Sequence, residues 1–144
     1  MYGILTVIHS LLRWAVLLLL LATIIKSLHG LISKRSFSDS DNRISLFMMI
    51  SAHTQLLVGI ILYFVSPFVK MGDTSDKEIR FFTMEHSTMM IVAIVFMTLA
   101  RILSKKAATD TAKFRRLFIF SLIALLIIIM AIPWPFSPIS RPWF

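Results

Sequence analysis

The chain has 144 residues, of which 58% are apolar and 15% are charged, and its formal net charge is +8. The charged residues gather in short segments between long apolar runs, which is typical of membrane proteins rather than soluble domains. There is no cysteine, which excludes disulfides, zinc–thiolate sites, iron–sulfur clusters, covalent c-type haem attachment and thiol nucleophiles. The basic residues flank apolar runs and are not interleaved with aromatic residues, so we expect no nucleic-acid partner.

Four apolar runs are long enough to cross a bilayer. The first has no basic residue before Arg13 and continues into Lys26, unlike a cleaved signal peptide, so we expect a retained helix. The second follows a capping cluster at 38–41, and the fourth is stopped by Pro133. The expected helices span about 4–28, 42–66, 79–103 and 115–132.

The expected helices are joined by short connections, and the sequence has no internal repeat or long linker. This pattern predicts an all-α fold, an up-down-up-down four-helix bundle that forms a single transmembrane domain over residues 1–144. The ending, 133–144, has too many prolines for a helix and too many aromatic residues for a free disordered end. We expect it to lie along the membrane interface.

The charges between the apolar runs predict the orientation, because basic residues are retained on the cytoplasmic side of a membrane. The connection near residue 70 carries acidic residues that offset its basic ones, whereas the other two are mainly basic. We therefore expect those two inside, with both termini outside, in the inner membrane of a bacterium. Their basic residues are Lys26, Lys34, Arg35, Arg43, Arg101, Lys105, Lys106, Lys113, Arg115 and Arg116.

Polar side chains within the apolar runs are the candidate functional residues, because a charge in hydrocarbon costs on the order of 2.5–3.5 kcal/mol by insertion scales. His9 and Arg13 are four positions apart and so share one helix face, which we expect to look into the bundle. The alternative is that Arg13 extends to the interface and His9 bonds a neighbouring carbonyl.

His53 falls near the middle of the second run and needs a partner inside the protein. Gln55 points about 200° away from His53 around the helix, so we expect Gln55 to bond a neighbouring helix instead. On the predicted topology His86 lies at a depth similar to that of His9, so these two imidazoles could face each other. Glu85, next to His86, fits an interfacial carboxylate, a proton acceptor or an ion-pair partner.

Imidazoles from separate helices of a bundle are what a b-type haem requires, with one nitrogen on each side of the iron. We therefore predict that two of the histidines His9, His53 and His86 ligate one haem, and that Arg13 pairs with its propionates. His53 either replaces one of the other two or binds at the far end of the site. Proton relays, quinone contacts and copper or zinc sites are also compatible with intramembrane histidines, although the methionines fit core filler better than copper ligands.

Several segments carry a resemblance to a known family. They are His9-Ser-Leu-Leu-Arg13-Trp14, Ser51-Ala-His53-Thr-Gln55-Leu-Leu-Val-Gly59-Ile-Ile-Leu-Tyr63, Glu85-His86-Ser-Thr-Met-Met90, Lys105-Lys-Ala-Ala-Thr-Asp110, Ile132-Pro-Trp-Pro-Phe136 and Arg141-Pro-Trp-Phe144. Over nearly its whole length the chain resembles small bacterial four-helix integral membrane proteins commonly labelled cytochrome b. The resemblance implies a b-type haem and a role in electron transfer.

Two functions remain as expectations. The first is an electron carrier linked to quinol or to a respiratory chain, and the second is a non-redox accessory subunit whose buried polar residues join helices. A lipid bilayer is the expected surrounding in both cases, and a quinone, a larger membrane complex or further copies of the chain are candidate partners. The sequence has no nucleophile triad, P-loop or dinucleotide motif, so we do not expect catalysis by the chain alone.

Overall fold

The computed structural model describes residues 1–144. Four of its helices are long and apolar enough to cross a membrane, which confirms the predicted all-helical membrane fold. The third of these crossings is composite, because α3, the π-helical segment η1 and α4 follow one another without a break. The elements are α1 (Tyr2–Ser33), α2 (Asp39–Val65), α3 (Lys77–Arg80), η1 (Phe81–Glu85), α4 (His86–Lys106) and α5 (Asp110–Ala131).

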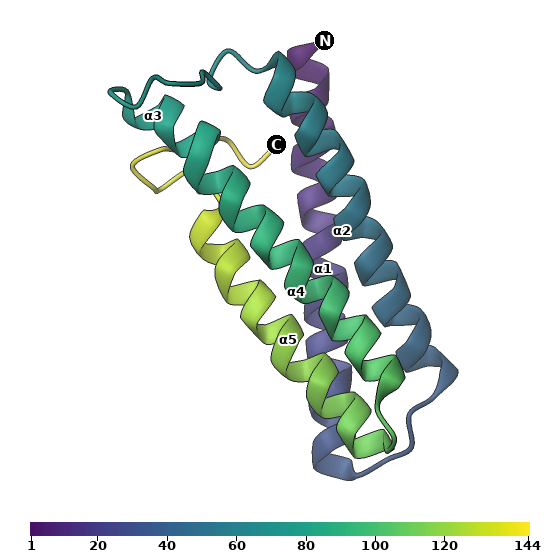
Figure 1. Cartoon of the computed structure of the whole chain (residues 1–144). Helices are drawn as coiled ribbons and strands as arrows, with labels where there is room; N and C mark the ends of the chain where they lie inside the picture. Colours follow the sequence, from purple (N-terminus) through teal and green to yellow (C-terminus); the bar gives the residue numbers. More distant parts are fainter.

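The helices form a bundle in which α1 contacts α2 and α5, while α4 contacts α5 and α2 (Figure 1). Figure 1 shows both chain termini toward one end of this bundle, here called the terminal end. The short connections 34–38 and 107–109 lie at the opposite end, here called the loop end. Which of the two ends faces the cytoplasm stays a prediction.

The helices at the loop end are longer than the apolar runs predicted, because side-chain caps start them within polar sequence. Ser38 Oγ accepts a hydrogen bond from the Asp41 backbone N–H, and the Asp41 carboxylate accepts one from the Ser38 N–H. This capping box starts α2 ahead of its first apolar residue. Thr109 likewise accepts from Ala112 N–H, so α5 begins at Asp110 rather than near residue 115.

The core follows the axis of the bundle and combines branched aliphatic side chains with alanines and methionines. Leu20, Met48, Met97 and Ala124 are fully buried there. Met48 and Met97 fill space between helices. The sequence analysis favoured this role for the methionines over the role of copper ligands. Many large apolar side chains are exposed along the helices and would face lipid.

Charged side chains are buried at the loop end, and hydrogen bonds and ion pairs compensate their charges. Asp41 is 1% exposed and receives two hydrogen bonds from Arg35, of 2.6 and 2.7 Å. Lys26 Nζ lies 3.8 Å from the same carboxylate. The hydrogen bond with Asp41 raises the pKa of the Arg35 guanidinium above its usual range. A buried carboxylate held this way keeps its charge at little net cost, because it is both paired and hydrogen-bonded.

Arg101, which the sequence analysis treated only as a loop charge, is also buried at the loop end. Its Nη1 donates to the backbone oxygen and the side-chain oxygen of Asn42 and to Ser45 Oγ, at 2.8, 3.1 and 2.8 Å. These bonds join α4 to the first turns of α2. The charge is therefore structural, and it ties two helices together at the loop end.

Gly30 lets α1 approach α5 closely at this same end. A Cβ added to Gly30 would lie 2.5 Å from Cζ of Phe114, whose side chain is fully buried. A second neighbour also contacts the Phe114 ring, since the Arg35 guanidinium lies 4.7 Å from the ring centroid. The ring therefore has little room to move.

We predict that Gly30→Ala destabilises the protein, because overpacking a tight contact costs about 1–3 kcal/mol. Gly3→Ala is the matched control, since it makes the same change in the same helix where no atom lies within 4 Å of the added Cβ. Thermal unfolding in detergent, followed by circular dichroism, should show a lower midpoint for Gly30→Ala and an unchanged or higher one for Gly3→Ala. Equal midpoints for the two variants would contradict this account of the α1–α5 contact.

Candidate functional site

Two histidines from different helices face each other at the terminal end. The rings of His9, on α1, and His86, at the start of α4, have centroids 6.4 Å apart and planes inclined at 67°. The structure thus brings together two side chains that are far apart in the sequence, at the similar depth that the sequence analysis expected. We call this arrangement the histidine pair.

The orientation of His86 is set by the end of α5. Its Nδ1 lies 2.8 Å from the backbone oxygen of Ala131, the last residue of that helix. Inside a helix this oxygen would accept from the residue four positions on, but that residue is Pro135, which has no N–H. A carbonyl only accepts, so Nδ1 carries the proton and Nε2 of the neutral ring keeps its lone pair. Metal-binding histidines are commonly oriented by such a bond.

A π-helical segment leads directly into His86. In η1 each backbone bond spans five residues rather than four, and the His86 N–H bonds to Phe81 O. The Ser87 hydroxyl also reaches back five residues, to Phe82 O at 2.8 Å. The rings of Phe81 and Phe82 lie 5.8 and 5.9 Å from the His86 ring. Short π segments occur frequently at functional sites, and hydrophobic periodicity gave no sign of this one.

Three buried polar atoms around His9 have no hydrogen-bond partner within the protein. They are His9 Nδ1, Arg13 Nε and Gln55 Oε1. The amide of Gln55 donates to the backbone oxygen of His9 at 2.9 Å, which confirms the expected bond between helices. Because buried polar groups are nearly always satisfied, a cluster of unsatisfied ones indicates a place where a bound group or water completes the bonding.

Gly59 brings α2 close to His9. A Cβ added at this position would lie 3.4 Å from Cε1 of the His9 ring. This distance is ordinary van der Waals contact, so Gly59 marks a close approach of α2 to the ring that faces His86. This approach is evident only from the structure.

Arg13 is bound by the C-terminal tail, residues 133–144. Its Nη2 donates to the backbone oxygen of Trp143 at 2.7 Å, and Trp14 Nε1 donates to the same oxygen at 3.2 Å. The rings of Trp14, Trp134 and Trp143 lie about 6 Å from one another, at 5.9 to 6.5 Å. The tail thus folds back on α1 at the terminal end, close to His9. Its Trp143 backbone oxygen is a neutral hydrogen-bond acceptor for the Arg13 guanidinium.

His53 does not join the histidine pair. Its ring is exposed on the outside of the bundle, with Nε2 2.9 Å from Thr98 Oγ1 on α4. The expectation that His53 shares the site with the other two histidines therefore lacks a geometric basis here. Glu85 also points elsewhere, and it forms an exposed ion pair with Arg80 at 3.2 Å.

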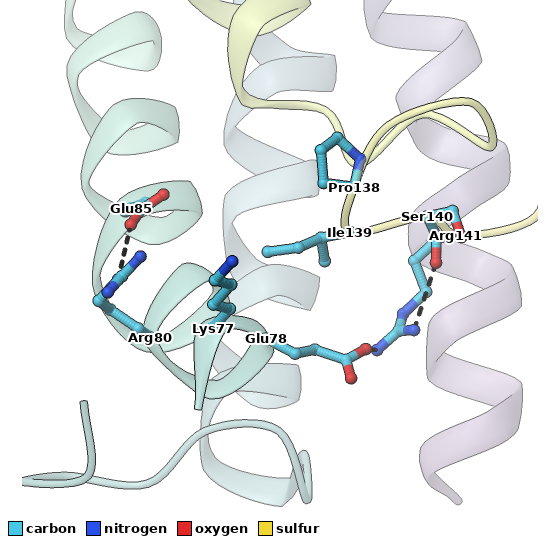
Figure 2. A pocket seen from close by; sticks show the side chains of 8 residues that line it. All are labelled: Lys77, Glu78, Arg80, Glu85, Pro138, Ile139, Ser140 and Arg141. Atoms are coloured by element: carbon cyan, nitrogen blue, oxygen red, sulfur yellow. Dashed lines mark hydrogen bonds and ion pairs between the residues drawn. The ribbon is translucent and has the colours of Figure 1, made fainter. Parts of the chain in front are cut away.

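A polar cavity of about 560 Å³ lies beside the site, between α3 and the tail (Figure 2). Ion pairs of Arg80 with Glu85 and of Arg141 with Glu78 form part of its wall. Neither histidine of the pair lines it. Its lining residues are Lys77, Glu78, Arg80, Glu85, Pro138, Ile139, Ser140 and Arg141.

Comparisons of the chain with protein families, with curated proteins and with solved structures found no match. One end of the membrane bundle holds the histidine pair, Arg13 and three buried polar atoms that have no hydrogen-bond partner within the protein. The function is inferred from these groups.

The histidine pair offers two imidazoles, which is the number of protein ligands that a b-type haem takes. No group of three or more His, Cys, Asp or Glu side chains is arranged to hold a metal, and a structural zinc needs four ligands. A haem brings its own four nitrogen ligands and asks the protein for two.

Proposed function

We propose that this protein is a b-type haem-binding electron carrier of the membrane. The observation that carries the proposal is the histidine pair, in which His86 presents an unprotonated Nε2 because its Nδ1 is bonded to Ala131 O. Neutral imidazoles from two helices are the axial ligands that such a haem takes. In this proposal His9 and His86 are the ligands and His53 is not.

Each neighbouring residue has a stated part in the proposal. Arg13 lies one turn from His9 and would pair with a haem propionate through its unsatisfied Nε, while its Nη2 stays on the tail. Gln55 orients the turn of α1 that carries His9 through its bond to the backbone. When bound, the haem supplies a site for one electron.

We further propose that the protein resides in the inner membrane of a bacterium and exchanges electrons with quinol or another respiratory component. The mainly basic loop end faces the cytoplasm by the distribution of charge. Since the chain has no cysteine, single cysteines test this orientation. An impermeant maleimide should label Ser75→Cys in intact cells and Ser36→Cys only after permeabilisation, and the reverse pattern would invert the assignment.

A second function, as a non-redox accessory subunit, is favoured by a different observation. The bonds Gln55–His9, His86–Ala131 and Arg13–Trp143 connect α1, α2, α4, α5 and the tail. Polar residues of this kind hold membrane helices together without any cofactor. In that case the purified chain would be colourless and would depend on a larger complex.

The decisive prediction concerns haem content. The chain expressed alone and purified in detergent should contain close to one b-type haem per chain, as measured by reduced-minus-oxidised spectra and a pyridine haemochrome assay. His9→Ala and His86→Ala should each weaken haem binding by at least about tenfold and lower the haem content, because second-shell losses alone reach that size in affinity and a ligand contributes more. Helical content should be retained in both variants.

His53→Ala is the matched control, since it removes an intramembrane imidazole that lies outside the pair. It should keep full haem occupancy and an unshifted spectrum. A folded wild-type protein without haem would contradict the electron-carrier proposal and support the accessory subunit. Loss of haem in His53→Ala alone would contradict the assignment of the ligands.

A further inference from the structure

His53 lies on the lipid-facing surface near the middle of a membrane-crossing helix. It is exposed, in a helix that runs from Asp39 to Val65 and is apolar enough to span. Intramembrane polar residues almost always face the bundle interior or a water-filled cavity, so an imidazole on the outside of the span requires an explanation. The histidine pair does not provide one, since His53 is not part of it.

The bonds around His53 fix which of its nitrogens carries the proton. The Thr98 hydroxyl donates to Ile94 O at 2.8 Å, so its single proton is already used. The contact of 2.9 Å between Thr98 Oγ1 and His53 Nε2 must then be a bond that the histidine donates. The neutral ring therefore has its proton on Nε2. Its Nδ1 is left with a lone pair, and no side chain or backbone group of the protein donates to it.

The surface around His53 is apolar and bulky. On α2 the exposed neighbours one turn away are Ile50 and Leu57, and on α4 Val95 lies one turn from Thr98. Thr54 is also exposed, but its hydroxyl is bonded to Ile50 O. Close packing of another membrane helix prefers a stripe of small residues, which this face lacks. The site therefore suits a molecule dissolved in the bilayer that offers one hydrogen-bond donor and an apolar ring.

We infer that His53 and Thr98 form a lipid-facing binding site for the hydroxyl group of a quinol. The quinol O–H donates to His53 Nδ1, and its ring lies against the apolar side chains Leu57 and Val95. Thr98 serves as a positioning residue, because its oxygen holds the tautomer that leaves Nδ1 free. The choice of a quinol among hydroxyl-bearing lipids rests on the proposed electron-transfer function, whereas the hydrogen bond itself does not.

The test uses the full chain as purified, kept reduced with dithionite, in nanodiscs of phosphatidylcholine and labelled with ¹⁵N in its histidines. The probe is a short-chain ubiquinol kept reduced under argon. Its dimethyl ether is the matched control ligand, since it keeps the ring and the chain and lacks the donor. We expect the His53 Nδ1 resonance to shift in a saturable manner with the quinol and to stay unchanged with the ether.

Two variants extend this experiment. His53→Phe should weaken quinol binding by roughly fivefold, the value of about one neutral hydrogen bond, when binding is measured by equilibrium partition. Thr98→Val should move the tautomer equilibrium of His53, visible in the ¹⁵N spectrum before any ligand is added. His29→Phe, at the loop end, is the control variant and should leave quinol binding unchanged.

Three outcomes would overturn the inference. They are an unshifted His53 resonance at saturating quinol, an equal shift with the ether, and a shift that depends on protein concentration without ligand, which would indicate a contact between copies of the chain. Because His53 is not a haem ligand in the proposed function and the protein stays reduced throughout, failure here is separate from failure of the haem proposal. If the chain binds haem but does not bind quinol, the proposal for the histidine pair stands and only the quinol site is ruled out.

Discussion

The bilayer interior contains no water to satisfy polar groups, and this constraint governs the arrangement of nearly every polar side chain in the protein. Serine and threonine hydroxyls within the spans bond backward to the backbone of their own helix, as Thr23 does to Leu19 O and Thr54 to Ile50 O. Groups that cannot do so are joined across helices, as Gln55 is to His9 O. The few buried polar atoms that bond neither within their own helix nor across helices are therefore informative.

The two ends of the bundle solve this problem differently. At the loop end each buried charge has its partners, since Asp41 is held by Arg35 and Arg101 by Asn42 and Ser45. At the terminal end His9, Arg13 and Gln55 each keep an atom without a partner, beside a pair of imidazoles. Complete compensation is what a structural role requires. Polar atoms without a protein partner, here beside ligand-type side chains, are places where water or a bound group completes the bonding.

Much of the site could be predicted from the sequence, because depth in the membrane follows from position along a span. His9 and His86 were expected at similar depth, and their rings approach each other in the structure. Gln55 was expected to bond another helix because it points away from His53, and it does. The lengths of the helices at the loop end were underestimated, because hydropathy does not register the caps made by Ser38 and Thr109.

Other features depend on rotation about helix axes or on contacts between distant segments, which periodicity does not report. The outward direction of His53, the burial of Arg101 and the return of Trp143 to Arg13 are of this kind. The π segment before His86 also left no recognisable pattern. One of these contacts could have been anticipated from the sequence in part. Pro135 lies four residues after Ala131 and so leaves the Ala131 oxygen free for His86.

In the proposed function His9 and His86 would both be ligands of one haem iron. Low-temperature electron paramagnetic resonance of the oxidised, haem-loaded protein tests it most directly, because two imidazole ligands make ferric haem low-spin. The account predicts a low-spin signal in the wild type, and a high-spin signal in whatever haem remains in His86→Ala. A high-spin signal in the wild type, or a low-spin signal that survives loss of either histidine, would contradict it.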